Sequence, residues 1–197
     1  MKVFIATKNQ KKLVELSRIL EPMGFEVVCE KDLDSPLKDI EETGTTFEEN
    51  AILKAEAGLK RTGFISVADD SGICVDYLDG APGIYSARFA GEGCTPRDCN
   101  DKMLRELKGV PFEKRGAHYV CCMALILPNG EEHTFEGTCD GYIIDEERGT
   151  NGFGYDPMFY VPQIDMTFGE APDDVKHKMS HRYFALLKLS EFIKGIE

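Results

Sequence analysis

The sequence predicts an α/β fold in which helices flank a mixed β-sheet. In the first part of the chain, short apolar segments alternate with segments of helical periodicity, as in parallel α/β proteins. In the second part, strand segments follow one another before a final helix, which favours antiparallel neighbours. The length of 197 residues suits one domain, and no repeat or long linker divides the chain.

The first elements come from the start of the chain. Residues 2–6 are mostly apolar and predict a buried strand. Leucines then recur at helical spacing and predict a helix over about 11–21, which Pro22 and Gly24 end. The segment 25–29 predicts a second short strand.

A capped helix and another strand follow. Thr45 and Thr46 each precede a glutamate by three residues, the pattern of a capping box. Gly63 ends this helix, and the apolar residues 64–68 predict a buried strand. We expect this strand to end in the polar segment 69–72.

The middle of the chain combines a loop, a helix and a hairpin. Residues 79–94 are rich in glycine and small side chains and predict a long ordered loop. Thr95-Pro96 joins an N-cap residue to a proline at the first helical position, so a helix should run to about Leu107. The segments 119–127 and 132–138 flank a Pro-Asn-Gly turn and predict a β-hairpin.

The last part of the chain returns to a helix. Residues 141–144 predict a further strand, and 145–157 a glycine-rich loop. The final helix should run from about Ser180 to Ile193. Its expected core side chains include Phe184, Leu187 and Leu189.

The composition limits the classes of function. Hydrophobic residues make up 42% of the chain and charged residues 29%, which excludes a wholly disordered protein. The formal net charge of −12 disfavours general binding to nucleic acids or anionic membranes. A small anionic substrate would need local cationic side chains or a divalent metal.

The cysteines and apolar runs indicate a compartment. Seven cysteines occur without any Cys-x-x-Cys pair, and the longest strongly apolar run, 119–127, is shorter than the ~20 residues of a membrane span. The first residues lack the long apolar stretch of a signal peptide. We therefore expect reduced thiols in a cytoplasmic protein rather than disulfides or a zinc site.

The turn after the first strand carries Thr7, Asn9 and Lys12. Such a strand-to-helix turn with a lysine suits a phosphate group. A polar turn in which Thr7 or Asn9 merely caps the helix explains the same residues, and taken alone it is the better interpretation. The segment lacks the glycines and the Gly-Lys-Ser/Thr of a P-loop.

Two acidic segments are candidates for metal binding. Glu41 and Glu42 precede a glycine turn and could reach a cleft, whereas helix capping explains the acids that follow. Asp69 and Asp70 are adjacent and repel each other unless a cation lies between them or their side chains diverge. Because carboxylates suit Mg²⁺, we favour a site at these aspartates and Ser71 over a capped turn.

A glycine-rich loop and the final helix could bind a planar ring. The glycines in 149–157 permit close backbone approach and leave Phe153 for stacking, although a surface loop with a buried ring is equally compatible. Lys176 lies just before the final helix, and His181 and Arg182 lie in its first turn, where cations oppose the helix dipole. This cost favours a binding role over a solvent-facing turn, since both side chains can donate hydrogen bonds to base oxygens or phosphate.

In this order, the segments resemble the inosine-triphosphate pyrophosphatase family, also called dITP/XTP pyrophosphatases. The resemblance covers nearly the whole chain. The matching segments are Ala6-Thr7-x-Asn9-x-x-Lys12-x-x-Glu15, Glu42-Thr43-Gly44-x-Thr46-Phe47-x-Glu49-Asn50-Ala51, Ala68-Asp69-Asp70-Ser71-Gly72, Gly80-Ala81-Pro82-Gly83-Ile84-Tyr85-Ser86-Ala87-Arg88, Gly152-Phe153-Gly154-Tyr155-Asp156-Pro157 and Ser180-His181-Arg182.

The resemblance implies a fold and a reaction. The fold would be a long, twisted mixed sheet in one domain over residues 1–197, with two lobes, a central cleft and usually a homodimeric assembly. The reaction would be hydrolysis of ITP, dITP or XTP between the α and β phosphates, giving the monophosphate and pyrophosphate. Mg²⁺ would be required, and the role would be cleansing of the nucleotide pool.

The resemblance also assigns residues by position. The phosphates would be bound by Thr7, Asn9, Lys12 and Ser71. Glu41 would help to hold Mg²⁺, and Asp70 would be the general base or a metal ligand, although Asp69 could take the proton instead. The base pocket and further nucleotide contacts would comprise Phe153, Gly154, Tyr155, Asp156, Lys176, His181 and Arg182.

The implied chemistry is consistent with these residue types. Donors from His181 and Arg182 favour a 6-oxo purine over adenine, whereas rejection of guanine does not follow from them. Lys8, Lys11 and Asn151 replace glycines that are usual in the family, which could alter the phosphate and base loops.

Two other functions fit part of the pattern. A pyrophosphatase for modified pyrimidine nucleotides would share the acidic metal site but would lack the Ser-His-Arg segment. A non-catalytic nucleotide-binding regulator would not need Asp70 near the phosphates.

Overall fold

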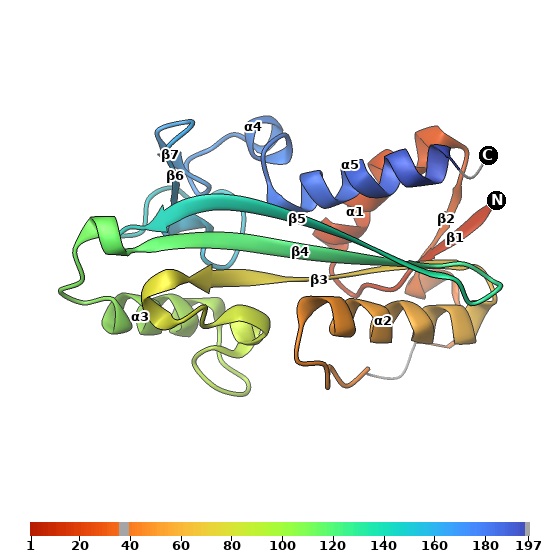
Figure 1. The fold of residues 1–197 in the computed structure, drawn as a ribbon, viewed down its shortest axis with the longest axis horizontal. Coiled ribbons are helices and arrows are strands. Elements are labelled where there is room, and N and C mark those ends of the chain that lie inside the picture. The colour runs from red at the N-terminus through yellow and green to blue at the C-terminus, as the bar shows by residue number, and fades with distance from the viewer. Residues whose placement is uncertain (36–39, 196–197) are drawn as a thin grey trace. The chain divides into compact units, whose positions relative to one another are not determined.

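The computed structural model describes residues 1–35 and 40–195, and it confirms the α/β class with a mixed sheet (Figure 1). The strands are β1 (Lys2–Ile5), β2 (Glu26–Val28), β3 (Ile65–Val75), β4 (Gly116–Ile126), β5 (Glu132–Ile143), β6 (Phe159–Val161) and β7 (Met166–Thr167). Their order in the sheet is β2-β1-β3-β4-β5-β6-β7. β1 pairs in parallel with β2 and β3, whereas β6 pairs antiparallel with β5 and β7.

The α-helices follow the predicted capping signals. They are α1 (Gln10–Leu20), α2 (Phe47–Thr62), α3 (Pro96–Glu106), α4 (Asp173–His177) and α5 (His181–Lys194). Thr46 caps α2 by accepting a hydrogen bond from the Glu49 backbone, and Gly63 ends the helix with a φ of 70°. Thr95 forms a capping box with Asp98 at the start of α3. These helix ends were predicted correctly because each depends on neighbouring residues only.

The chain forms two compact units whose boundaries fall within β3, β4, β5 and α5. The first unit comprises Met1–Asp70, Cys121–Gly137 and Phe184–Glu197, and the second comprises Ser71–Val120 and Thr138–Tyr183. In the first unit, α1 and α5 cover one face of the strands and α2 covers the other (Figure 1). In the second unit, α3 packs its buried residues against the apolar residues of β3.

Two strand predictions need correction. β3 does not end at 69–72 but continues to Val75, with the two aspartates in its middle. The segment 141–144 is no separate strand, because β5 runs from Glu132 to Ile143 and keeps alternate residues buried past Gly141. At Gly141 a Cβ atom would lie 2.5 Å from the Tyr160 carbonyl, so the glycine permits the close approach of β6 rather than breaking the strand.

The core face of α5 was also predicted wrongly in part. Leu189 is fully buried as expected, but Phe184 and Leu187 are 39% and 37% exposed. The buried face consists of Ala185, Leu186, Leu189 and Ile193. These residues recur at helical spacing, which leaves Phe184 and Leu187 on the other side.

The remaining expectations concern membranes and thiols. Of the helices in the described part of the chain, none combines the length and apolar character that a membrane span requires. All seven cysteines are free thiols in the structure, four of them buried.

Candidate active site

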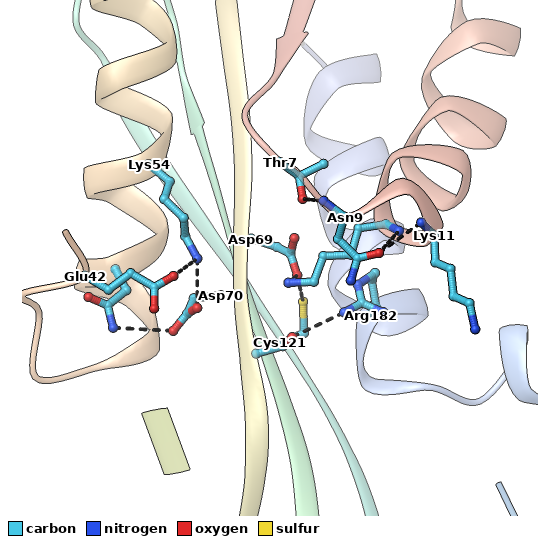
Figure 2. Close-up of polar contacts among 12 residues, drawn as sticks. Thr7, Asn9, Lys11, Glu42, Lys54, Asp69, Asp70, Cys121 and Arg182 are labelled. Atoms are coloured by element: carbon cyan, nitrogen blue, oxygen red, sulfur yellow. Dashed lines mark hydrogen bonds and ion pairs between the residues drawn. The ribbon is translucent and has the colours of Figure 1, made fainter. Parts of the chain in front are cut away.

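The centre of β3 places two carboxylates on opposite sides of one strand. Asp69 and Asp70 are 3% and 7% exposed, and their side chains diverge across β3 (Figure 2). This divergence follows from the alternation of side chains along a strand. Adjacent carboxylates avoid repulsion either by a cation between them or by diverging side chains, and here the side chains diverge. Each aspartate therefore has its own partners.

Asp70 faces α2, where a lysine joins two acids. Lys54 Nζ donates to Asp70 Oδ1 at 2.8 Å and to Glu42 Oε1 at 3.0 Å (Figure 2). Asn50 lies one helical turn before Lys54, and its Nδ2 is 3.5 Å from Asp70 Oδ2. The Asn50 side chain also accepts from the Gly44 backbone at 2.9 Å. Asn50 therefore ties the segment around Glu42 and Gly44 to the helix that carries Lys54.

The Asp70–Lys54 ion pair is largely shielded from solvent. Burial raises the pKa of Asp70, and this effect outweighs the lowering by the Lys54 ammonium. Burial alone would lower the pKa of Lys54, but attraction to Asp70 and Glu42 raises it overall. Lys54 is thus held as a cation beside a carboxylate that is more basic than usual.

Asp69 faces α1 and holds the lysine of the first turn. Lys12 Nζ lies 2.8 Å from Asp69 Oδ2, and the exposed fractions of the two side chains are 16% and 1%. The Cys121 thiol approaches the same oxygen at 3.8 Å. The lysine predicted to bind phosphate is therefore fixed by a buried carboxylate.

The preceding residues of this turn serve local structure. Asn9 is the N-cap of α1, and its Oδ1 accepts from the backbone of Lys11 and Lys12 at 2.9 and 3.4 Å. Thr7 Oγ1 accepts from the Asn9 backbone at 3.2 Å. The capping interpretation is confirmed for Asn9, whereas Thr7 contacts only the backbone of the cap residue. The roles of Thr7 and Asn9 toward a phosphate stay predictions.

The two glutamates before the glycine turn differ in position. Glu42 is half-buried beside Lys54, whereas Glu41 is exposed and its backbone carbonyl accepts from Thr43. Within residues 1–35 and 40–195, no group of three or more histidines, cysteines, aspartates or glutamates is arranged to hold a metal. The assignment of a metal to Glu41 stays a prediction, and Glu42 is the acid that lies near Asp70.

In the second unit, Asp156 organises the glycine-rich loop. Asp156 is 3% exposed, and its Oδ2 accepts from Lys176 Nζ at 2.5 Å and from the Phe153 backbone at 2.6 Å. Gly152 is needed here, because a Cβ atom at this residue would lie 2.1 Å from that carboxylate oxygen. The Phe153 ring remains 42% exposed, with Lys176 Nζ 5.0 Å from its centroid. The structure therefore brings Phe153, Asp156 and Lys176 together.

The first turn of α5 is buried rather than solvent-facing. His181 and Arg182 are 5% and 3% exposed. Ser180 caps the helix by accepting from the Tyr183 backbone at 3.2 Å. Arg182 Nη2 donates to Ser71 Oγ at 3.2 Å, so the arginine and the predicted phosphate contact lie together. A buried arginine cation beside a buried histidine in this turn, at a cost to the helix dipole, favours a binding role.

The family model of the Ham1 family matches residues 3–192. This protein belongs to the Ham1 family. A dITP/XTP pyrophosphatase of Bacillus licheniformis is 50% identical over 191 residues, which are 97% of each chain. The solved Ham1 protein of Staphylococcus aureus has a TM-score of 0.91 at 41% identity over 100% of both chains. A Ham1 protein from Coxiella burnetii has a TM-score of 0.92 at 37% identity over 99% of both chains. These matches confirm the resemblance seen in the sequence motifs.

Sequence reasoning missed two polar residues around Asp70 in this Ham1-family protein. Lys54 and Asn50 carry a signal that could have found them, since they lie four residues apart on the helix that follows the acidic segment. Both polar residues lie on the helix face that carries the buried Ala51 and Ala55, which indicates that they contact polar groups of the protein rather than solvent.

Two further residues support the glycine-rich loop of this Ham1-family protein. The Tyr119 hydroxyl lies 3.3 Å from Asp156 Oδ1, and its ring stacks on His181 with centroids 4.8 Å apart at 11°. Asn100 Nδ2 donates to Glu147 Oε1 at 2.8 Å and to the Gly154 carbonyl at 3.2 Å. Tyr119 gave no signal because it lies in a continuous apolar run.

Proposed function

We propose that this protein hydrolyses deaminated purine nucleoside triphosphates, such as ITP, dITP and XTP, to the monophosphate and pyrophosphate. One observation carries the proposal. Strand β3 presents a buried, unusually basic carboxylate, Asp70, directly beside a lysine and a second acid. This set suits phosphoanhydride hydrolysis, and relatives of the same family that match nearly the whole chain are named dITP/XTP pyrophosphatases.

In this proposal, Asp70 orients and deprotonates the attacking water. A general base works best when its pKa lies near the working pH, and burial raises the pKa of Asp70 in that direction. Each aspartate contacts one lysine at 2.8 Å, so this contact does not distinguish them. Asp69 is the weaker candidate because its side chain is only 1% exposed, against 10% for Asp70, which leaves less access for the attacking water.

The cations of the first unit would bind the triphosphate. Lys12 and Lys54 each offer an ammonium group that could turn from its carboxylate to a phosphate oxygen. Thr7 and Asn9 would add contacts from the turn before α1, and Ser71 would add its hydroxyl. Positioning and charge compensation of this kind are what phosphoryl transfer demands of a protein.

The donors around Asp70 fit a hard divalent cation such as Mg²⁺. Glu42 and Asp70 already bracket one cation, the Lys54 ammonium, at 3.0 and 2.8 Å. Two carboxylates match the number that Mg²⁺ usually takes from a protein, with water and phosphate oxygens completing its shell. We propose that Asp70 holds Mg²⁺ together with Glu42 or Glu41. When bound, the ion would neutralise charge on the phosphates and polarise the bond that breaks.

The second unit would recognise the base. The exposed Phe153 ring would stack on the purine, in a pocket that Gly154, Tyr155 and Asp156 shape. His181 and Arg182 would donate hydrogen bonds to the 6-oxo group, and Lys176 would contact the nucleotide from beside Phe153. Adenine carries a donor at the same position, and an unpaired buried donor costs about 1–3 kcal/mol.

The cellular setting is part of the proposal. Seven free thiols are compatible with a reducing cytoplasm, where a pool-cleansing enzyme would meet its substrates. We also propose a homodimer, as the family resemblance implies, and a sizing measurement would test it.

Pyrophosphate release from ITP, XTP, GTP and ATP with Mg²⁺ tests the proposed function. ITP and XTP should turn over about 100-fold faster than GTP and ATP, a gap of about 2.7 kcal/mol in activation free energy. Arg182→Ala should reduce the ratio of ITP to ATP turnover. Faster hydrolysis of dTTP or UTP than of ITP would favour a pyrimidine pyrophosphatase. Binding without any turnover would favour a regulator.

A further inference from the structure

Two cysteine thiols lie side by side at the start of α3. Cys94 Sγ and Cys99 Sγ are 3.3 Å apart. Thr95 is the N-cap of α3 and Pro96 its first residue, so Cys94 precedes the cap and Cys99 is the fourth helical residue. These are the two positions of a hydrophobic staple, which brings their side chains together by local geometry alone.

The two thiols differ in their access to solvent. Cys94 is half-buried and its Sγ is 3.8 Å from the Ala87 carbonyl, whereas Cys99 is only 3% exposed. A disulfide requires sulfurs at about 2.0 Å, so the pair needs an approach of about 1.3 Å. Side-chain rotation at the partly exposed Cys94 can supply such a movement without unfolding the helix.

Cys99 also contacts the loop that shapes the proposed base pocket. Cys99 and Tyr155 belong to the same buried core, and the Cys99 side chain adds to the effect of burial in raising the pKa of Tyr155. The Tyr155 hydroxyl donates to the Ser86 carbonyl at 2.8 Å. The next residue of α3, Asn100, donates to the Gly154 carbonyl at 3.2 Å. A displacement of Cys99 therefore acts directly on Tyr155 and, through its neighbour, on Gly154.

We propose that Cys94 and Cys99 form a modification site, a dithiol that small disulfides such as oxidised glutathione convert to an intramolecular disulfide. The Cys94 thiolate attacks one sulfur of the small disulfide, which releases one thiol and leaves a mixed disulfide on Cys94. The Cys99 thiolate then attacks the Cys94 sulfur and releases the second thiol. The protein loses two protons and two electrons, and the small disulfide gains them to become two thiols.

Closure of this bond removes the Cys99 thiol proton and fixes the Cys99 sulfur beside Tyr155 in a new bond. We expect weaker binding of the purine base, a consequence that rests on the proposed function, whereas formation of the bond does not. The hydrogen bond between the thiols and their partial burial raise the pKa of Cys94. Cys94 therefore attacks small disulfides slowly.

The other thiols provide the controls. Burial raises the pKa of Cys122 and Cys139 to about 12, which makes them poor nucleophiles. Cys29 is half-buried like Cys94, and its backbone is held by Asp32 in the first unit. Cys29→Ser is therefore the matched control for Cys94→Ser.

The experiment treats the whole protein with oxidised glutathione and digests it with trypsin without reduction. Trypsin cleaves after Arg97, between the two cysteines, so a disulfide keeps two peptides joined. We expect joined peptides in the parent and in Cys29→Ser, separation after reduction, and no joined peptides in Cys94→Ser. Stable glutathione on Cys94 without closure, or no reaction at this pair, would overturn the proposal.

Kinetics with ITP test the consequence. The oxidised parent should show a KM raised about threefold or more, the cost of about one hydrogen bond, with full recovery after reduction. Cys94→Ser should keep the KM of the reduced parent in either condition. A closed disulfide with unchanged KM would contradict the coupling to Tyr155. If the reduced parent has no turnover at all, the proposed function fails while the peptide result still decides the modification site.

Discussion

Replacement of Lys54 by methionine should destabilise the first unit by about 3 kcal/mol. The variant keeps the unbranched stem of the side chain but leaves Asp70 and Glu42 without the ammonium that lies 2.8 and 3.0 Å from them. The side chains of Lys54 and Asp70 are 14% and 10% exposed, so the pair is closer to a buried than to a surface ion pair. Breaking a buried pair costs about 3–5 kcal/mol, and we take the lower end because Glu42 is 31% exposed.

The loss of stability should depend on pH. Burial raises the pKa of Asp70 in the folded protein above that in the unfolded chain, and removal of Lys54 raises it further. A carboxyl group with a raised folded pKa favours folding while it is protonated, and this contribution is lost as the pH rises through the folded pKa. The Lys54→Met variant should therefore be nearly as stable as the parent at about pH 4 and clearly weaker at about pH 8.

Thermal unfolding of the parent, of Lys54→Met and of the double variant Lys54→Met/Asp70→Asn measures the loss of stability. A loss of about 3 kcal/mol corresponds to a lowering of Tm by about 6–12 °C in a chain of this size. The double variant Lys54→Met/Asp70→Asn removes both charges and should recover most of the loss. A pH-independent loss below about 1 kcal/mol would refute the reasoning, because that is the behaviour of an exposed pair. So would a double variant as unstable as the single one.

Three further predictions concern the base and the metal. Phe153→Ala should raise the KM for ITP about tenfold without lowering Tm, because the exposed ring would stack on the base but supports little of the core. Tyr119→Phe keeps the stack on His181 and should retain the preference for ITP over ATP, whereas Tyr119→Leu should lose it in the same turnover assay. Glu42→Gln should weaken Mg²⁺ binding in calorimetry more than Glu41→Gln, because only Glu42 lies beside the Asp70 pair.

The parts of the structure that could be predicted from the sequence are those fixed by neighbouring residues. The cap at Asn9, the cap at Thr95 and the stop at Gly63 each depend on hydrogen bonds or backbone angles within a few residues. The same holds for the β4–β5 hairpin, whose turn is closed by hydrogen bonds from the Leu127 backbone to Glu131 and from the Gly130 backbone to Leu127. Features of this kind can be predicted from a few neighbouring residues.

The course of β3 could not be predicted because it depends on distant elements. Two adjacent aspartates after an apolar run look like the end of a strand when only neighbours are considered. They remain inside β3 because Lys12 of α1 and Lys54 of α2 compensate one carboxylate on each side. The sequence contains both lysines, but it does not show that they reach the same strand.

Short elements escaped prediction for a different reason. β6 and β7 have three and two residues, and α4 has five, which is too short for a periodic pattern. β6 is defined by its pairing with β5 and β7 rather than by its own residues. The role of Tyr119 was hidden likewise, since only the fold places its hydroxyl at Asp156 and its ring on His181.

The charges around β3 bear on how an acidic protein could bind a polyanion. Lys12 and Lys54 face three carboxylates, Glu42, Asp69 and Asp70, so these side chains sum to a charge of −1. Neither lysine is available for a phosphate without competition, because each already lies within 3.0 Å of a carboxylate. A triphosphate must compete with those carboxylates for the lysines, unless a divalent cation compensates them. Metal dependence should therefore show in binding affinity as well as in turnover.

Asp70→Asn separates these two effects. The variant should lose turnover because it lacks the proposed base, yet it should bind ITP more tightly than the parent when metal is chelated. Removal of one negative charge and partial release of Lys54 should gain at least about 1 kcal/mol, or about fivefold in Kd by calorimetry. Asp140→Asn is the matched control, because it changes the net charge equally at an exposed residue of β5 and should leave Kd unchanged. Metal-free binding that is no tighter in Asp70→Asn would mean that the lysines reach the phosphates without competition from this carboxylate.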